Sequence, residues 1–110
     1  MLLAEVFSNL LTNAVEAGNG PPIVRVVATD GATVRIEVTN HGAGIPLELQ
    51  ERVFEPFFTT KPRGTGLGLA IARQVTEAHG GTIVLVSDGS TVTTFVVELP
   101  RAGAPVEVLA

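Results

Sequence analysis

The first stretch of the chain carries apolar and polar residues at helical spacing. Apolar positions recur every three or four residues and predict one buried helix face: Leu3, Val6 or Phe7, Leu10, Ala14 and Ala17. A polar stripe lies beside them, at steps of four, four and three: Glu5, Asn9, Asn13 and Glu16. The pattern therefore predicts an amphipathic helix over residues 2–17 that presents two carboxamides one turn apart.

Two pairs of β-branched runs predict two antiparallel hairpins. The first pair, residues 23–28 and 33–39, is separated by a turn containing Asp30-Gly31. The second pair, residues 82–87 and 92–99, is separated by Asp88-Gly89-Ser90. Between the hairpins the sequence predicts a glycine-rich loop over 40–46, a polar helical turn over 47–52 and a second helix over 70–79. The expected apolar stripe of that helix is Leu67, Ile71, Val75 and Ala78.

This order of elements predicts an α+β fold. Helices on one face of a mixed, mainly antiparallel sheet of about four strands would form a two-layer sandwich. With 110 residues, 45% hydrophobic and 16% charged, the chain is long and apolar enough for one folded domain. We assign residues 1–100 to that domain and residues 101–110, with their scattered Pro, Gly and Ala, to a flexible tail.

Charge and cysteine content exclude several classes of function. A formal net charge of -4 gives no general attraction to nucleic acid or to an anionic membrane, so an anionic ligand must be held by local groups. The absence of cysteine excludes disulfides and thiolate metal sites. No apolar run approaches the ~20 residues of a membrane span. The chain begins inside a helix, so we expect it to be a piece of a longer protein. We expect this piece to be cytoplasmic and leave open a membrane anchor in the full-length protein.

A glycine-rich turn opens the second predicted helix, over residues 64–69. Backbone N–H groups of such a turn can surround an anion, aided by the positive end of the helix. The Walker A pattern is absent, and the dinucleotide-binding pattern fails because Leu69 replaces its third glycine and no strand precedes it. The simpler interpretation, a tight turn, does not require three alternating glycines. The turn alone is weak evidence for a phosphate site.

The carboxamides of the first helix also allow two interpretations. A lone asparagine there usually belongs to a solvated face. A carboxamide oxygen is also a hard, neutral ligand for Mg²⁺, which proteins commonly share with the phosphates of a substrate. Two asparagines in register favour the metal site only modestly.

Four stretches in order resemble the boxes of two-component sensor histidine kinases. Residues 9–14 resemble the N box, 42–46 the G1 box, 54–61 the F box and 64–69 the G2 box, and His79-Gly80-Gly81 also matches. The resemblance implies the Bergerat ATP-binding fold, which DNA gyrase, the MutL repair proteins and the large heat-shock chaperones share. The polar segment 59–63, a short lid, and the Asn-Ala-Val-Glu-Ala sequence at residues 13–17 look most like the nitrogen-regulation branch of these kinases.

The resemblance also implies a function. The chain would be the catalytic domain that binds Mg²⁺ and ATP and donates the γ-phosphate to a histidine on a separate dimerisation domain. That domain would be its direct partner, and the full-length protein would act on a response regulator. Neither His41 nor His79 has the setting of the receiving histidine. His41 lies in the nucleotide loop. His79 lies at the C-terminal end of a helix, where a histidine interacts favourably with the helix dipole.

Roles follow from the resemblance residue by residue. Asn13 would be the Mg²⁺ ligand, with Asn9 beside the metal and the terminal phosphates, and Asn9 and Lys61 would be the catalytic pair. Lys61 or Arg63 would reach the γ-phosphate, although ordinary lid solvation explains either one nearly as well. Thr93 would lie near the base, although a plain strand residue is an equal explanation. The implied nucleotide-binding set is Asn9, Asn13, Asn40, Gly42, Gly44, Ile45, Lys61, Arg63, Gly64, Thr65, Gly66, Leu67, Gly68, Leu69 and Thr93.

Two positions depart from the family pattern. Asn40 stands where members usually have an aspartate that accepts a hydrogen bond from the adenine amino group. A carboxamide oxygen still accepts that bond, but charge assistance is lost and the side-chain NH₂ needs a partner. Glu16 stands where many members have a basic residue near the phosphates.

Other functions fit the same fold. An anti-sigma-factor type serine kinase would form acid-stable phosphoserine instead of acid-labile phosphohistidine. A non-catalytic module would bind a nucleotide or a partner without transfer, and Asn40 gives this alternative some weight. An ATPase clamp of the gyrase kind fits less well, because Asn9 occupies the position of its glutamate base.

Overall fold

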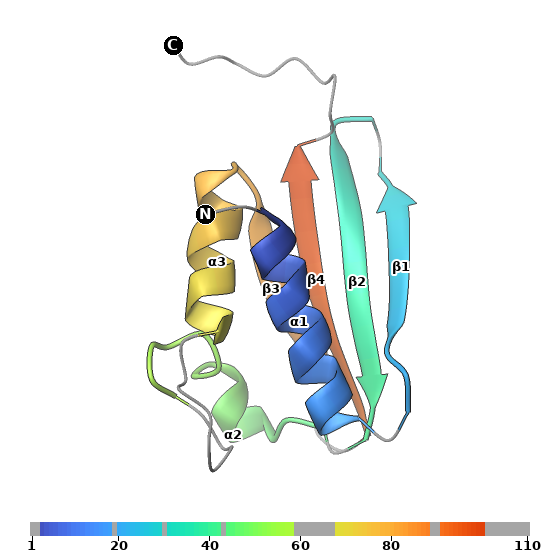
Figure 1. Cartoon of the computed structure of the whole chain (residues 1–110), viewed down its shortest axis with the longest axis vertical. Coiled ribbons are helices and arrows are strands. Elements are labelled where there is room, and N and C mark those ends of the chain that lie inside the picture. The colour runs from blue at the N-terminus through green and yellow to red at the C-terminus, as the bar shows by residue number, and fades with distance from the viewer. Residues whose placement is uncertain are drawn as a thin grey trace.

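The part of the chain that the structure describes folds into three helices and four strands. The computed structural model describes residues 3–18, 20–29, 31–42, 44–58, 68–88 and 91–100. The elements, in chain order, are α1 (Leu3–Ala17), β1 (Ile23–Ala28), β2 (Thr33–His41), α2 (Leu47–Gln50), α3 (Gly68–Ala78), β3 (Thr82–Ser87) and β4 (Val92–Pro100). Their order is the predicted one (Figure 1).

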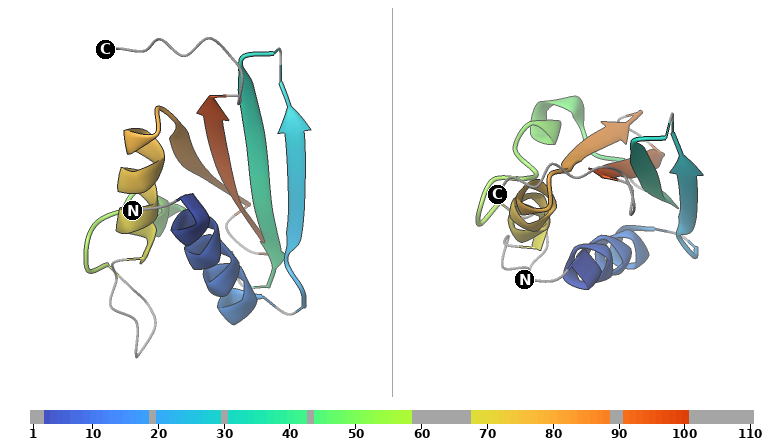
Figure 2. Two further views of the ribbon diagram at one scale, coloured as in Figure 1. Left: turned by 45° about the horizontal axis from the view of Figure 1, so that its top comes forward. Right: turned by 90° about the horizontal axis from the view of Figure 1, so that it is seen from above.

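A single four-stranded sheet organises the molecule. Its strand order is β1-β2-β4-β3, and each of its three pairings is antiparallel. Both predicted hairpins are present, and the β2–β4 ladder joins them into one sheet. Helices α1 and α3 lie on the same face of this sheet, as the views in Figures 1 and 2 show. The predicted two-layer α+β fold is confirmed.

The core lies between the two helices and the inner face of the central strands. Helix α1 contributes Val6, Leu10 and Ala14, each at most 2% exposed, which confirms the predicted apolar face. Strands β2 and β4 contribute Val38, Phe95 and Val97. Burying a large apolar side chain stabilises a fold by about 1.5–3 kcal/mol. The alternation along each strand therefore fixes which face meets the helices.

Helix α3 differs from its predicted register. It begins at Gly68 rather than at residue 70, and its buried residues are Ala72, Val75 and Thr76. Ala78, which was predicted in the stripe, is exposed, and Leu67 lies outside the described residues. Thr76 tolerates burial because its hydroxyl donates to the carbonyl of Ala72 at 2.7 Å. A search for large apolar residues misses a face built from alanine and threonine.

Strand β1 forms one edge of the sheet beyond the cover of the helices. It pairs with β2 along its whole length, from Ile23 with Thr39 to Ala28 with Val34. The side chains of Ile23, Val24 and Val26 are nevertheless half exposed or more. The predicted strand is confirmed, but its apolar residues contribute little to the core.

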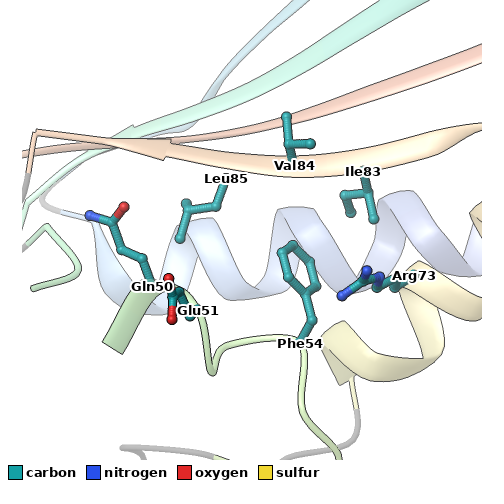
Figure 3. A pocket seen from close by; sticks show the side chains of 7 residues that line it. All are labelled: Gln50, Glu51, Phe54, Arg73, Ile83, Val84 and Leu85. Atoms are coloured by element: carbon teal, nitrogen blue, oxygen red, sulfur yellow. The ribbon is translucent and has the colours of Figure 1, made fainter. Parts of the chain in front are cut away.

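Three phenylalanines after α2 point in different directions. Phe54 packs edge-on against Phe95, with ring centroids 6.0 Å apart, and the guanidinium of Arg73 lies 5.6 Å from the Phe54 centroid. Phe57 is 75% exposed, and Phe58 lies under Arg52. Phe54 also lines an open pocket of about 430 Å³ between α2, α3 and β3 (Figure 3). Of the predicted nucleotide-binding residues that the structure describes, none lines this pocket.

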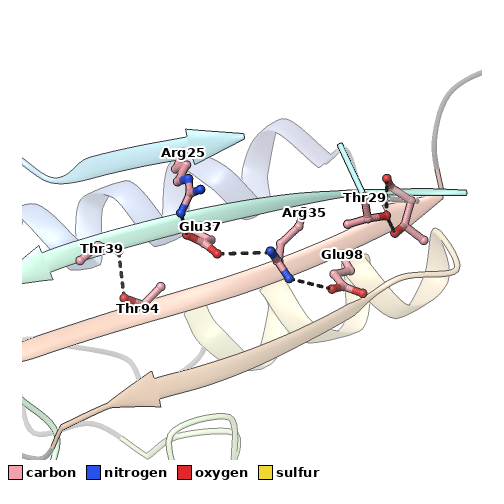
Figure 4. Close-up of polar contacts among 8 residues, drawn as sticks. Arg25, Thr29, Arg35, Glu37, Thr39, Thr94 and Glu98 are labelled. Atoms are coloured by element: carbon pink, nitrogen blue, oxygen red, sulfur yellow. Dashed lines mark hydrogen bonds and ion pairs between the residues drawn. The ribbon is translucent and has the colours of Figure 1, made fainter. Parts of the chain in front are cut away.

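The face of the sheet away from the helices carries a row of charges (Figure 4). Glu37 on β2 lies 3.8 Å from Arg25 on β1 and 3.3 Å from Arg35. Arg35 also reaches Glu98 on β4 at 4.0 Å. These pairs cross three strands, so they tie the sheet together on its wet side.

None of the helices in the described ranges is long and apolar enough to cross a membrane. The proposed tail, residues 101–110, and the lid residues 59–63 lie outside the described residues.

Candidate functional site

The polar stripe of α1 meets the beginning of α3. The amide nitrogen of Asn9 donates to the carbonyl of Gly68 at 3.3 Å. Asn9 and Asn13 are both half-buried, while Glu5 and Glu16 of the same stripe are exposed. The two asparagines therefore lie on the side of α1 that turns toward α3, as their common stripe predicts.

The first turn of α3 supplies backbone donors beside Asn9. The helix begins at Gly68, so Gly68 and Leu69 belong to its first turn, where N–H groups have no partner within the helix. No acidic residue lies in this turn. An anion placed there would meet unopposed N–H groups and the positive end of the helix dipole.

Asn40 and Thr93 form a buried polar pair at one end of the sheet. They face each other across the β2–β4 ladder, and each side chain is 3% exposed. The Asn40 amide nitrogen and the Thr93 hydroxyl are buried without a hydrogen-bond partner in the described chain. Both residues continue the inner face that Val38 and Phe95 form. The core thus ends in two polar groups that no described residue satisfies.

The predicted glycine-rich loop is shorter than expected. Asn40 and His41 belong to β2, because His41 pairs with Val92 and the Gly42 amide donates to the carbonyl of Thr91 at 2.9 Å. His41 is therefore an exposed strand end and not a loop residue. The sequence predicts this strand only over residues 33–39. Pairing with the β-branched residues of β4 extends it to His41.

Gly18 brings the end of α1 against the end of β2, a role that the sequence analysis missed. It forms a bridge with Gly42, and its amide donates to the carbonyl of Ala14 at 2.9 Å. A Cβ at Gly18 would lie 2.9 Å from that carbonyl oxygen and 3.3 Å from the Cβ of Asn40. Only a residue without a side chain allows this approach. The Gly18-Asn19-Gly20-Pro21-Pro22 run is typical of a helix stop, but it does not reveal this contact.

The segment 44–46 is held in place from two sides. The amide of Ile45 donates to the hydroxyl of Ser87 at 3.2 Å, and its carbonyl accepts from the Gln50 amide at 2.8 Å. Ile45 and Leu69 both pack against the core cluster, and Gly44 is half-buried beside Ile45. Ser87 and Gln50 carried no signal in the sequence, because the contacts of both with Ile45 are hydrogen bonds to its backbone, and Ser87 makes its contact from 42 residues away.

His79 has the predicted place at the end of α3. It follows the last helical residue, and its Nδ1 lies 2.8 Å from the carbonyl of Val75. The same carbonyl accepts the backbone N–H of His79 at 3.1 Å, so a ring N–H would be its second donor at the helix end. His79 therefore has a structural role.

The remaining predicted binding residues cannot be placed in this site. Lys61, Arg63, Gly64, Thr65, Gly66 and Leu67 lie outside the described residues. Their assignments stay predictions.

The oxygen donors of α1 fit a metal that is shared with a ligand. The hydrogen bond of Asn9 uses its nitrogen, which leaves the oxygen to act as an acceptor or a metal ligand. Across the described ranges, no group of three or more His, Cys, Asp or Glu could hold a metal ion. Mg²⁺ is commonly bound by one or two protein oxygens together with substrate phosphates and water. The chain thus offers the partial set of donors that such sharing requires.

Comparison with known proteins defines the class. The family model described as histidine kinase-, DNA gyrase B- and HSP90-like ATPase matches residues 1–103, and the chain belongs to this family. Within it, the resemblance to sensor histidine kinase catalytic domains is confirmed by the relatives below.

The sensor histidine kinase ZraS of Escherichia coli K12 is 42% identical over 99 residues, which cover 89% of this chain and 21% of ZraS. The crystallised catalytic domain of histidine kinase ThkA has a TM-score of 0.77 and 42% identity, over 88% of this chain and 64% of that one. Full-length ShkA in complex with AMPPNP has a TM-score of 0.81 and 32% identity, over 89% of this chain and 21% of ShkA. The chain thus spans about a fifth of the length of ZraS.

Proposed function

We propose that this chain is the ATP-binding catalytic domain of a sensor histidine kinase. It binds ATP together with Mg²⁺ between α1, the 40–46 segment and the start of α3. It then presents the γ-phosphate to a histidine on a separate dimerisation domain, and the full-length protein passes the phosphate to a response regulator.

The contact between Asn9 and Gly68 supports this proposal most directly. It joins the helix that carries the candidate metal ligands to the helix end that offers phosphate donors. The ShkA complex adds support, because a protein with 32% identity and a TM-score of 0.81 binds an ATP analogue. ZraS and ThkA are named as histidine kinases, which favours this function over the serine kinase and the non-catalytic module.

The residues would act mainly by positioning and by local charge. Phosphoryl transfer requires little covalent chemistry from the protein, so alignment and neutralisation of the phosphates account for most of the catalysis. Asn13 and Asn9 would hold Mg²⁺, which would supply positive charge at the phosphate oxygens. The N–H groups of the first turn of α3 would hold phosphates, and Ile45 and Leu69 would flank the base. A base for the receiving histidine would come from the other domain.

A titration of ATP with and without Mg²⁺ tests the proposal. Wild type should bind ATP more tightly with Mg²⁺. Asn13→Ala should lose most of this metal-dependent gain, because it removes a carboxamide oxygen. Thr12→Ala is the matched control, since Thr12 is the exposed neighbour of Asn13 on the same helix. Calorimetry measures all three affinities.

The nature of the transfer needs a second measurement. The full-length protein should form a phosphate linkage that acid removes and alkali preserves, whereas an acid-stable linkage would point to the serine kinase. If wild type does not bind ATP, or if Asn13→Ala and Thr12→Ala behave alike, the assigned pocket is wrong. The relation to the nitrogen-regulation branch stays a prediction.

A further inference from the structure

We propose that Asn40 determines which purine the site accepts, and that the site binds 6-oxopurine nucleotides about as well as ATP. This inference rests on the proposed function and specifies its nucleotide. The ligand class is a purine triphosphate that carries either an amino group or an oxygen at position 6.

The buried pair of Asn40 and Thr93 carries the inference. Each residue is 3% exposed, and the two are direct partners in the β2–β4 ladder. The Asn40 amide nitrogen and the Thr93 hydroxyl have no hydrogen-bond partner within the described residues. Native proteins rarely leave buried polar groups unpaired, because the loss of water is then uncompensated. A ligand with polar edge atoms would satisfy both groups.

The surroundings of the pair fit the edge of a flat apolar base. Asn40 follows Val38 on the inner face of β2, and Thr93 precedes Phe95 on the inner face of β4. A Cβ on Gly18 of the α1 end would come within 3.3 Å of the Asn40 Cβ, so α1 closes one side of the pair. Ile45 packs against the same core cluster. The pair is thus a polar patch at the end of an apolar layer.

A carboxamide can read both kinds of purine edge. In a 6-aminopurine the exocyclic amine donates and N1 accepts, whereas in a 6-oxopurine O6 accepts and N1–H donates. The oxygen of Asn40 accepts and its nitrogen donates, so a half-turn of the amide matches either pattern with two hydrogen bonds. The hydroxyl of Thr93 both donates and accepts, so it opposes neither base. Asn40 therefore does not exclude a base that carries a 6-oxo group.

A carboxylate at the position of Asn40 would discriminate between 6-aminopurines and 6-oxopurines. It accepts but does not donate when ionised, so it pairs with a 6-amino group and repels O6 in the same pose. Asn40→Asp should therefore keep or strengthen ATP binding and weaken 6-oxopurine binding. Inosine triphosphate is the suitable probe, because its base differs from that of ATP only at position 6 and in the proton on N1. Guanosine triphosphate adds a 2-amino group with its own needs.

The test compares the dissociation constants of ATP and inosine triphosphate, both with Mg²⁺, by calorimetry. In wild type the two constants should agree within about tenfold, and Asn40→Asp should widen their ratio by about tenfold or more, as expected when one buried group becomes unpaired. Gln74→Glu adds the same charge at an exposed position of α3 and should leave the ratio unchanged. Thermal melts of each variant report whether it is folded.

Each outcome decides between the inference and the function on which it rests. If wild type binds ATP but binds inosine triphosphate more than about tenfold more weakly, the inference is wrong and the proposed function stands. An unchanged ratio in a folded Asn40→Asp variant also overturns the inference. If wild type binds neither nucleotide, both fail together. The wild-type ratio decides the matter even if Asn40→Asp does not fold.

Discussion

The carboxamide of Asn9 on α1 donates to the backbone carbonyl of Gly68 on α3, at 3.3 Å and in contact with solvent. An exposed hydrogen bond contributes little to folding, so Asn9→Ala should change the free energy of unfolding by less than about 1 kcal/mol. We expect the same variant to weaken Mg²⁺-dependent ATP binding by about tenfold, the equivalent of about 1.4 kcal/mol. Urea melts and calorimetry measure the two effects, with exposed Ser8 changed to alanine as the control. Equal losses in stability and binding would make Asn9 merely structural.

Two valines test where the core lies. Val97 on β4 is 0% exposed, and Val26 on β1 is 65% exposed. We expect Val97→Ala to lower the free energy of unfolding by about 2 kcal/mol or more, because it removes buried methyl groups and leaves a cavity. Val26→Ala should cost under about 1 kcal/mol. Urea unfolding of both variants gives the comparison, and similar costs would contradict the assignment of β1 to an uncovered edge.

Gly81 allows α3 to turn closely into β3. A Cβ there would lie 2.2 Å from the carbonyl oxygen of Glu98 and 2.8 Å from the Leu99 side chain, whereas no described neighbour lies within 4 Å of a Cβ on Gly20. Gly81→Ala should therefore destabilise the fold by about 1–3 kcal/mol through overpacking. Gly20→Ala should be neutral or stabilising, because it only restricts the unfolded chain. The midpoints of thermal unfolding distinguish the two, and a neutral Gly81→Ala would show that the junction can open.

Glu37 joins two arginines on the outer face of the sheet, at 3.8 Å from Arg25 and 3.3 Å from Arg35. Glu37→Gln should lower the free energy of unfolding by about 0.5–1 kcal/mol, the upper range for partly exposed pairs. The loss should shrink between about 0.05 M and about 1 M salt, because salt screens such charges. Glu55→Gln is the control, since its pair with Arg52 is more than half exposed on both sides. A loss that salt leaves unchanged would point to packing instead of charge.

The fold was predictable because two periodicities alternate along the chain. The three-to-four spacing of Val6, Leu10 and Ala14 marks α1, and the alternation through Val38 marks β2. Helix α3 was predicted in place but not in register. Its buried face contains Ala72 and Thr76, whose burial depends on close approach to α1 and on a backbone hydrogen bond that periodicity does not reveal.

The candidate site was only partly predictable. The resemblance to sensor histidine kinases pointed to Asn9, Asn40 and Thr93, and the structure brings Asn40 and Thr93 together in one ladder. It also shows that each has a buried polar atom without a partner among the described residues, which no sequence pattern reports. The contacts of Ser87 with Ile45 and of Gly18 with Gly42 join residues far apart in the sequence, and a local pattern cannot foresee them.

The register of the β2–β4 ladder links the packing of the core to recognition of the base. A slip of one residue in its pairing would turn one strand over relative to the other, so that Asn40 would leave the inner face together with Val38, or Thr93 together with Phe95 and Val97. A misregistered molecule would therefore lose its selectivity for the base and its hydrophobic anchor at the same moment. A population that is folded but unable to bind the base is therefore not expected, and all of the folded protein should recognise its ligand.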